Sequence, residues 1–248
     1  MLETETEVIT ISKVEVKLGD NVILKDIDLN IRKGEIVGFL GPSGSGKTTL
    51  VKAIIGMNKA SGGNIEVLGV RMPSLEIATK IGYMAQSDAL YEDLNAMGNL
   101  IFFAELYGVK RKEAKIRAEE VLALVGLSEY AKKAVRYFSG GMKRRLSLAI
   151  ALMHKPQILI LDEPTVGIDP VLRKSFWNEF EKIRAAGGTI IVTTHVMDEA
   201  YKCDRLALIR EGEIIAEGSP EEIIKATGAR NIEEAFLCYS GVKEEAEA

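Results

Sequence analysis

The stretch Gly41-Pro42-Ser43-Gly44-Ser45-Gly46-Lys47-Thr48-Thr49 (GPSGSGKTT) matches the phosphate-binding pattern G-x-x-x-x-G-K-[ST]. An apolar run ending at Leu40 predicts a strand before it, and residues 49–55 predict a helix after it. Glycines let a backbone wrap around an anion with its N–H groups pointing inward, and the helix adds the positive end of its dipole. Lys47 is expected to reach the β- and γ-phosphates, and the Thr48 hydroxyl to ligate Mg²⁺. A Gly/Ser loop that binds nothing is disfavoured because strand, loop and helix agree. The sequence therefore predicts a nucleoside triphosphate site.

Composition limits the class of protein. The 248 residues are 47% hydrophobic and 27% charged, which is typical of one large α/β domain or of a core with a subdomain. The formal net charge of −4 and the sequence pI of about 5.5 argue against a nucleic-acid binder with a basic face. No apolar run approaches the roughly 20 residues that cross a bilayer, and the acidic start does not resemble a signal peptide. Cys203 and Cys238 lack metal-site spacing and are predicted to be reduced, buried side chains in the cytosol.

Apolar patterns predict strands along most of the chain. Residues 8–18 and 22–31 predict a hairpin that turns at Gly19-Asp20-Asn21. A second, terminal hairpin is predicted to turn at Glu211-Gly212. Single strands are predicted at 36–40, 65–68, 81–85, 158–161 and 189–193. Because several of these are continuously apolar and alternate with helices, the sequence predicts a mostly parallel sheet covered on both faces.

Between residues 94 and 153 the apolar period becomes helical. The first helix is expected to place Leu100, Phe103, Leu106 and Tyr107 on one face. The second, over residues 112–125, carries Ile116, Val121, Leu122 and Val125 and ends at Gly126. This block, inserted between strands, predicts an α-helical subdomain.

A second chemical signal is Asp162-Glu163, which follows the apolar run 158–161. Ligands bind at the carboxyl ends of parallel strands, so Asp162 is expected to hold Mg²⁺ beside Thr48. Glu163 is then expected to face the γ-phosphate and deprotonate an attacking water. The alternative is a pair of solvated carboxylates at a strand end, which the phosphate loop upstream disfavours.

Two further strand ends carry polar residues. Gln86 follows the strand 81–85, and His195 follows the strand 189–194. A lone histidine at a strand end is usually structural, but parallel neighbours would bring Gln86, Asp162 and His195 to one edge of the sheet. A γ-phosphate contact is therefore predicted for His195.

A third signal is Ser139-Gly140-Gly141, which opens a helix through Met142. It predicts either a second anion-binding helix N-terminus or an ordinary serine N-cap. One triphosphate needs only one cradle, so the second would serve the nucleotide of another subunit.

Taken together, the motifs resemble the ATP-binding subunits of ABC transporters, in the order and spacing of that family. The matches are GPSGSGKTT (41–49), Gln86 after a strand, FSGGMKRR (138–145), ILILDEP (158–164), GID (167–169) and TTH (193–195). The serine-glycine-glycine signature makes the likeness specific, since many NTPase families share the phosphate loop. The sequence, and Gly167-Ile168-Asp169-Pro170 in particular, is most similar to exporter-type, ABC-2-like subunits.

The resemblance implies a head-to-tail dimer, with itself or with a homologous ATPase, that sandwiches two ATP molecules with Mg²⁺. Each nucleotide would lie between the phosphate loop of one subunit and Ser139-Gly140-Gly141 of the other. Glu163 would be the catalytic base, and Gln86 would sense Mg²⁺ and water. Asp169 would contact the opposite subunit, and His195 would hold the γ-phosphate. A short helix of a separate integral membrane permease would dock near Gln86, on the inner face of the cell membrane.

Two features depart from the family pattern. The residue expected to stack on adenine is aromatic in the family, and the aligned position here is Leu18. Apolar contact from Leu18 or Val16 would partly replace stacking, at a loss of about 1 kcal/mol. In the signature, Phe138 and Met142 stand where a leucine and a glutamine are typical, and Met142 cannot donate the hydrogen bond of an amide. The contacts of Ser139 and of the glycine backbone are unaffected, so function is expected to persist.

The sequence thus predicts an α/β protein with a P-loop NTPase (RecA-like) core, an antiparallel β subdomain and an inserted helical subdomain. The expected boundaries are 1–92 and 155–225 for the core and β subdomain, 93–154 for the helical subdomain, and 226–248 for a C-terminal helix and tail. The expected activity is ATP hydrolysis that drives transport through the permease. A soluble ABC-type ATPase acting on nucleic acid or ribosomes is the alternative, disfavoured by the acidic charge and by the single ATPase domain. A nucleotide kinase or GTPase lacks support, because Asn58-Lys59-Ala60-Ser61 has no guanine-reading aspartate.

Overall fold

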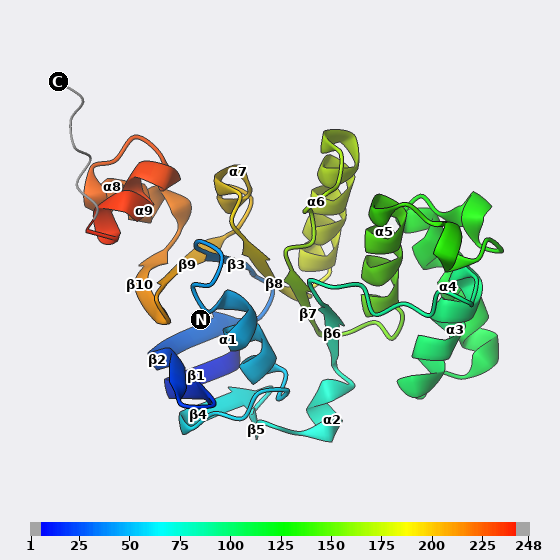
Figure 1. Cartoon of the computed structure of the whole chain (residues 1–248), viewed down its shortest axis with the longest axis horizontal. Helices are drawn as coiled ribbons and strands as arrows, with labels where there is room; N and C mark the ends of the chain where they lie inside the picture. Colours follow the sequence, from blue (N-terminus) through cyan, green and yellow to red (C-terminus); the bar gives the residue numbers. More distant parts are fainter. Residues whose placement is uncertain (1–5, 242–248) are drawn as a thin grey trace, which may run out of the picture. The chain divides into compact units, whose positions relative to one another are not determined.

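The computed structural model describes residues 6–241, which form two compact units (Figure 1). The first unit contains residues up to 74 together with those from 191 onward, and the second contains residues 75–190. The predicted tail beyond residue 242 lies outside the described residues. Strand β8 (Thr189–Thr194) runs across the boundary between the units.

An antiparallel sheet begins the first unit. Strands β1 (Glu7–Leu18) and β2 (Asn21–Arg32) pair from Glu7↔Arg32 to Leu18↔Asn21, which confirms the predicted hairpin. The turn contains Gly19 and Asp20 only, and Gly19 takes a φ of +60°. Strands β4 (Gly62–Val67) and β5 (Val70–Arg71) extend the sheet in the order β2-β1-β4-β5.

A second group of strands in the first unit positions the phosphate loop. All five residues of β3 (Ile36–Leu40) are buried, as expected for a continuously apolar parallel strand. It pairs in parallel with β9 (Arg205–Arg210), which forms the predicted terminal hairpin with β10 (Glu213–Gly218). A Cβ on Gly38 would lie 2.8 Å from Cys203 Sγ, so only glycine fits this point of β3.

One helix of the first unit has clear sequence signals at both of its ends. Ser219 and Glu222 form a capping box at the start of α8 (Pro220–Thr227), and Gly228 ends it with a φ of +69°. Helix α9 (Ile232–Tyr239) packs on α8 (Figure 1). The expected boundary at residue 226 therefore falls inside a helix. The other helices are α1 (Lys47–Ile54) and α7 (Met197–Ala200).

The second unit holds two parallel strands and a group of helices. Strand β6 (Ile81–Met84) pairs with β7 (Ile158–Asp162) from Ile81↔Ile158 to Met84↔Leu161. A Cβ on Gly82 would meet the carbonyl oxygen of Ala151 at 2.3 Å, so the end of α5 packs directly on β6. The helices are α2 (Leu75–Ala78), α3 (Ala96–Leu106), α4 (Arg111–Leu124), α5 (Gly140–Ala151) and α6 (Pro170–Ala185), with short 3₁₀ turns at Ser128–Tyr130 and Val135–Tyr137.

Two side chains of the apolar helical pattern, and one cysteine predicted to be buried, are exposed. Leu106 is 67% exposed at the last residue of α3, and Ile116 is 56% exposed on α4. Both satisfy the helical period, but α3 and α4 bury narrower faces, which contain Leu100 and Val121. Cys238 is exposed on α9, whereas Cys203 is buried as expected. The predicted helical subdomain, residues 93–154, lies wholly within the second unit, and its limits stay a prediction.

Candidate functional site

The phosphate loop connects β3 to α1 in the first unit. Gly44 and Gly46 have φ angles of +81° and +108°, which side chains rarely adopt. A Cβ on Gly46 would also lie 2.8 Å from Leu24 Cδ2. The ammonium of Lys47 is buried and donates to the carbonyl oxygens of Gly41 (2.8 Å) and Pro42 (2.9 Å). The loop is therefore folded into a turn around its own lysine.

The loop has features that fit a phosphate group. Helix α1 begins without a side-chain cap and has no acidic residue in its first turn. Its N–H groups and the positive end of its dipole are then suited to an anion. The Ser45 hydroxyl is buried and has no hydrogen-bond partner within the described residues. It is a donor suited to the same anion.

A segment far away in the sequence holds the main chain of the phosphate loop. Gly212, in the turn between β9 and β10, donates its N–H to the carbonyl oxygen of Ser45 (3.0 Å) and accepts from Lys25 N–H (2.9 Å). Its φ is +82°, and a Cβ there would lie 2.1 Å from the Ile23 carbonyl oxygen. The terminal hairpin thus fixes the main chain of the phosphate loop.

Two other predicted residues lie in the first unit. Leu18 ends β1 with 48% of its surface exposed, so it is accessible to a ligand. His195 is exposed directly after β8. The backbone on both sides of it is held by Thr194, whose hydroxyl donates to Glu199 (2.8 Å) and accepts from the Val196 N–H (3.0 Å).

The second unit brings Gln86 and Glu163 together. Gln86 follows β6 by two residues, Asp162 is the last residue of β7, and Glu163 comes next. The amide of Gln86 donates to the Glu163 carboxylate at 3.4 Å. Asp162 is fully buried, whereas Gln86 is exposed. Glu163 has a φ of +51°, a left-handed conformation that is unusual for a residue with a side chain and marks a sharp turn after the strand.

The serine-glycine-glycine loop is a capped helix start. Ser139 precedes α5, and its side chain accepts from the Met142 N–H at 3.3 Å. Ser139 and Gly140 are exposed. Both sequence-based interpretations therefore remain compatible, because a serine that caps through its oxygen still has a hydroxyl proton to donate. Asp169 similarly caps α6 by accepting from the Leu172 N–H (3.0 Å), with Pro170 in the first turn.

The sequence analysis missed Arg144, on α5. Its guanidinium donates to the carbonyl oxygens of Ala85 (2.7 Å) and Gln86 (3.0 Å), and to those of Asp162 and Glu163 (2.7 Å for the latter). The side chain is only 8% exposed. A signal was available: Arg144 lies four residues before buried Leu148 and seven before buried Ala151, on the apolar face of its helix.

Burial changes the electrostatics at this place. Burial lowers the pKa of Arg144, and the nearby carboxylates of Asp88, Asp162 and Glu163 oppose that change. Burial and the charge of Asp162 raise the pKa of Tyr83, on β6, to about 12, while Arg144 partly counters them. The ends of β6 and β7 therefore form one electrostatic environment with α5.

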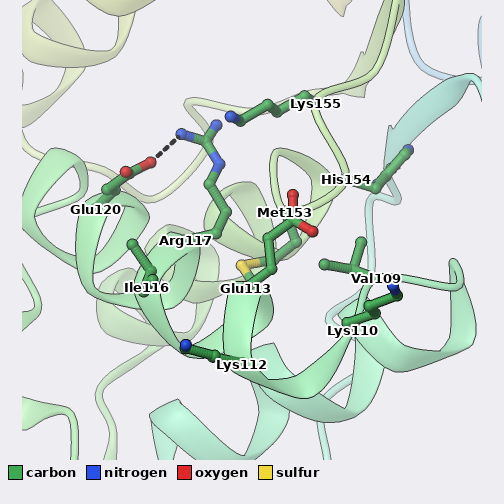
Figure 2. Close-up of a pocket in the computed structure, with 10 residues that line it drawn as sticks. All are labelled: Val109, Lys110, Lys112, Glu113, Ile116, Arg117, Glu120, Met153, His154 and Lys155. Carbon is green, nitrogen blue, oxygen red and sulfur yellow. Dashed lines mark hydrogen bonds and ion pairs between the residues drawn. The ribbon is translucent and has the colours of Figure 1, made fainter.

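A separate groove of about 340 Å³ lies on the second unit, and none of the predicted site residues lines it (Figure 2). Val109, Ile116 and Met153 give it apolar surface, and Arg117 forms an ion pair with Glu120 at 2.8 Å along its edge. It does not belong to the candidate nucleotide site.

A glycine-lined phosphate loop between a buried strand and a helix, in a protein of parallel strands and helices, defines a P-loop NTPase. Residues 24–166 match the family model for ABC transporters. The chain belongs to the ABC transporter family, as one of its ATP-binding subunits.

Curated relatives agree with this family. The chain is 43% identical to the linearmycin resistance ATP-binding protein LnrL of Bacillus subtilis (strain 168), over 91% of this chain and 73% of the relative. It is 37% identical to the daunorubicin resistance ATP-binding protein DrrA3 of Streptomyces coeruleorubidus, over 91% and 72%. It is 38% identical to Nod factor export ATP-binding protein I of Burkholderia orbicola (strain AU 1054), over 86% and 71%.

Solved structures agree as well. An ATP-binding subunit of an ABC transporter superposes with a TM-score of 0.87 at 25% identity, covering 94% of this chain and 99% of that one. The dimeric, post-hydrolysis cassette MJ0796 bound to ADP and Pi gives a TM-score of 0.79 at 28% identity, covering 85% and 98%. The chain is therefore an ATPase with the P-loop NTPase fold, the motor of a transporter. Neither these relatives nor these solved structures support the alternative of a nucleic-acid or ribosome factor. No helix among residues 6–241 has the length and apolar character that crossing a membrane requires.

Proposed function

We propose that this chain hydrolyses ATP as one half of a head-to-tail dimer, with itself or with a homologous ATPase, and that it drives a separate integral membrane permease. The observation that carries the proposal is the phosphate loop, with its uncapped helix start and the buried hydroxyl of Ser45, which has no hydrogen-bond partner among residues 6–241. The proposed location is the cytoplasmic face of the cell membrane, where the permease would hold the dimer.

In this proposal the phosphate loop, Gly41 to Thr49, binds the triphosphate, with Lys47 on the β- and γ-phosphates. Leu18 gives the adenine an apolar contact, and its exposure at the end of β1 supports that role. His195 holds the γ-phosphate. The Thr194–Glu199 hydrogen bond supports this role, because it fixes the backbone beside the histidine.

Magnesium is proposed as the metal, with Thr48, Gln86 and Asp162 as its protein ligands. A hydroxyl, an amide oxygen and a carboxylate are hard oxygen donors, the kind that Mg²⁺ prefers, and one carboxylate with substrate phosphates is its usual arrangement. When bound, the ion would neutralise negative charge on the phosphates.

Glu163 is proposed as the general base. Its carboxylate accepts from the Gln86 amide at 3.4 Å, an arrangement in which Gln86 orients the carboxylate and the water beside it. The water proton passes to Glu163 while the water oxygen attacks the γ-phosphorus in line with the leaving ADP oxygen. The nucleotide held by the partner subunit would be bound by Ser139, Gly140, Gly141 and the next residue, Met142. Asp169 would contact that subunit.

Export is the proposed direction of transport. The relatives that resemble this chain include a linearmycin resistance protein, a daunorubicin resistance protein and a Nod factor export protein. Two of these names describe resistance to a compound, and the third describes export. An exporter-type, ABC-2-like permease is the partner that this similarity supports.

Glu163→Gln tests the proposal. ATP binding is expected to persist and turnover to fall by a factor of about 100 or more, since a general base contributes roughly 10²–10⁴. Size-exclusion chromatography with light scattering should show a monomer alone and a dimer with ATP and Mg²⁺. Glu119→Gln, an exposed glutamate on α4, is the matched control and should behave as the unmodified chain.

Two results would contradict parts of the proposal. Normal turnover by Glu163→Gln would remove the assigned general base. A protein that binds ATP but stays monomeric would exclude the self-paired dimer and leave pairing with a homologous ATPase or assembly on the permease.

A further inference from the structure

Adjacent arginines on α5 make the same kind of contact with different parts of the second unit. Arg144 donates to four main-chain carbonyls, two at the end of β6 and two at the end of β7. Arg145 donates to the carbonyls of Val125 (3.2 Å) and Gly126 (3.0 Å), which end α4. In both, the Nε–H is buried and has no partner among the described residues. One arginine therefore joins α5 to the proposed catalytic segments, and the other joins it to the helical region.

We propose that Arg144 is a positioning residue for ATP hydrolysis, which holds the main chain of Gln86 and Glu163 in register and ties both to the helix that Ser139 begins. This inference rests on the proposed roles of Gln86 and Glu163. It adds a residue that touches neither nucleotide nor water and acts through those two.

The shape of the guanidinium suits this position. Its planar fork offers separate pairs of N–H groups in fixed directions, so one side chain can serve two carbonyls on each of two chain segments. Lysine has a single ammonium point and cannot span both segments. The buried charge is balanced by Asp88, 3.9 Å away, which Ser147 of the same helix holds by a hydrogen bond of 2.7 Å.

The conformation of Glu163 explains why such a support is needed. Its φ of +51° is unfavourable for a residue with a Cβ and persists only when the surroundings enforce it. The Arg144 contact to the Glu163 carbonyl (2.7 Å) and the Gln86 contact to its carboxylate (3.4 Å) act on the two ends of this residue. Arg144 also bonds to the Gln86 carbonyl, so it fixes both members of the pair.

One consequence concerns the link between two nucleotides in a dimer. Ser139 begins α5, and Arg144 lies less than two turns along the same helix. Any shift of α5 that accompanies contact between Ser139 and the partner's nucleotide must move the guanidinium, and with it Gln86 and Glu163. Arg144 would then report occupancy of one ATP site to the hydrolytic residues that serve the other.

Arg144→Lys and Arg145→Lys form a matched pair for the test. We expect Arg144→Lys to lower kcat for ATP more than tenfold with KM changed less than twofold, because the phosphate loop is untouched. Arg145→Lys should change both by less than threefold. Arg144→Gln is the second variant at this site, used in the same comparison if the lysine variant does not bind ATP.

Hydrogen exchange of the backbone supplies a readout that general loss of stability would not reproduce. Arg144→Lys should speed exchange in residues 84–88 and 161–165 and leave 122–128 unchanged, and Arg145→Lys should show the reverse. Equal kcat values for the two variants, or a loss of ATP affinity as large as the loss of turnover, would overturn the inference. Glu163→Gln is measured in parallel. If Glu163→Gln keeps normal turnover while Arg144→Lys loses it, the proposed general base is wrong, and the lowered kcat of Arg144→Lys still supports a positioning role for Arg144.

Discussion

The phosphate loop and the signature loop, Ser139-Gly140-Gly141, both lead into helices, yet the two helix starts differ. Helix α1 begins at a glycine that offers no side-chain cap, and Lys47 is buried beneath the loop. Helix α5 begins at an exposed serine that caps its own helix through Met142 N–H. The N-terminus of α1 can therefore bind an anion without help from another subunit. At the N-terminus of α5, Ser139 already accepts one backbone hydrogen bond, so an anion there would be bound only by the serine hydroxyl proton and the glycine N–H groups. This contrast is what a protein needs if one loop binds nucleotide in the monomer and the other only completes the site in a dimer.

Removing the lysine should produce the largest effect. Lys47→Ala loses the contacts to the phosphates and the hydrogen bonds to Gly41 and Pro42. Each hydrogen bond to a charged group contributes about 1.5–3 kcal/mol, so ATP affinity should fall about 100-fold or more. Equilibrium binding of a fluorescent ATP analogue measures it, with Lys52→Ala in the last turn of the same helix as control. Retained affinity would mean that the first loop is not the primary nucleotide site.

Substituting the serine separates the capping role of the second loop from its proposed role in catalysis. Ser139→Ala should cost about 1 kcal/mol of stability, a shift of a few degrees in Tm, and should also reduce turnover several-fold with ATP affinity unchanged. Ser219→Ala removes an equivalent cap, the one at α8, and should match the Tm shift only. Thermal unfolding and steady-state ATPase assays on both variants give the comparison. Equal turnover in the two would reduce Ser139 to an ordinary N-cap.

Introducing an aromatic residue at the proposed adenine contact should tighten ATP binding. Leu18→Tyr offers a ring where the exposed leucine stands, and an aromatic contact contributes about 0.5–1.5 kcal/mol, which corresponds to a roughly fivefold tighter Kd for ATP. Isothermal titration with ATP and with tripolyphosphate distinguishes base from phosphate contacts, because only ATP should gain. Leu75→Tyr, at a 90% exposed position of the other unit, should change neither value.

The smallest effect concerns the far end of α5. His154 stacks on Tyr107 (ring centroids 3.8 Å apart) and its Nε2–H donates to the Ile81 carbonyl oxygen at 3.1 Å. Burial lowers the pKa of His154 below its usual 6.5, despite the opposing backbone hydrogen bond. The unfolded chain therefore takes up this proton at a higher pH than the folded chain, so stability falls as pH drops through about 6.5. His154→Gln should flatten this part of the Tm profile by a few degrees, in scans between pH 7.5 and 5.5. An unchanged profile would assign the pH dependence to other groups.

Much of the fold followed from local patterns. The strands β3 and β7 are continuous apolar runs, and the start of α8 carries a Ser-Glu capping box, so each is specified by its own residues. The faces of α3 and α4 were predicted less well. The helical period fits more than one stripe, and only packing against neighbours decides that Leu106 and Ile116 stay exposed.

The candidate site shows the same division. The residues that are proposed to touch nucleotide belong to contiguous motifs, so their types and spacing could be read directly. Arg144 and Arg145 stand side by side in one basic run, and only the helical spacing that places Arg144 on the face of Leu148 and Ala151 distinguishes them. Their different partners follow from the 100° turn between successive helix residues, which points one toward β6 and β7 and the other toward α4. Contacts of this kind depend on segments far away in the chain, and only the folded structure reveals them.

The hydrogen bond from Gly212 to Ser45 has a consequence for how the protein is made. The ribosome completes the phosphate-loop motif at Thr49, but the turn that supports it arrives only with Gly212. At a synthesis rate of about 5–20 residues per second, Gly212 is added on the order of ten to thirty seconds after Thr49. During synthesis the nascent chain therefore carries the motif without the backbone that shapes it, and tight ATP binding should begin only once the β9–β10 hairpin has emerged.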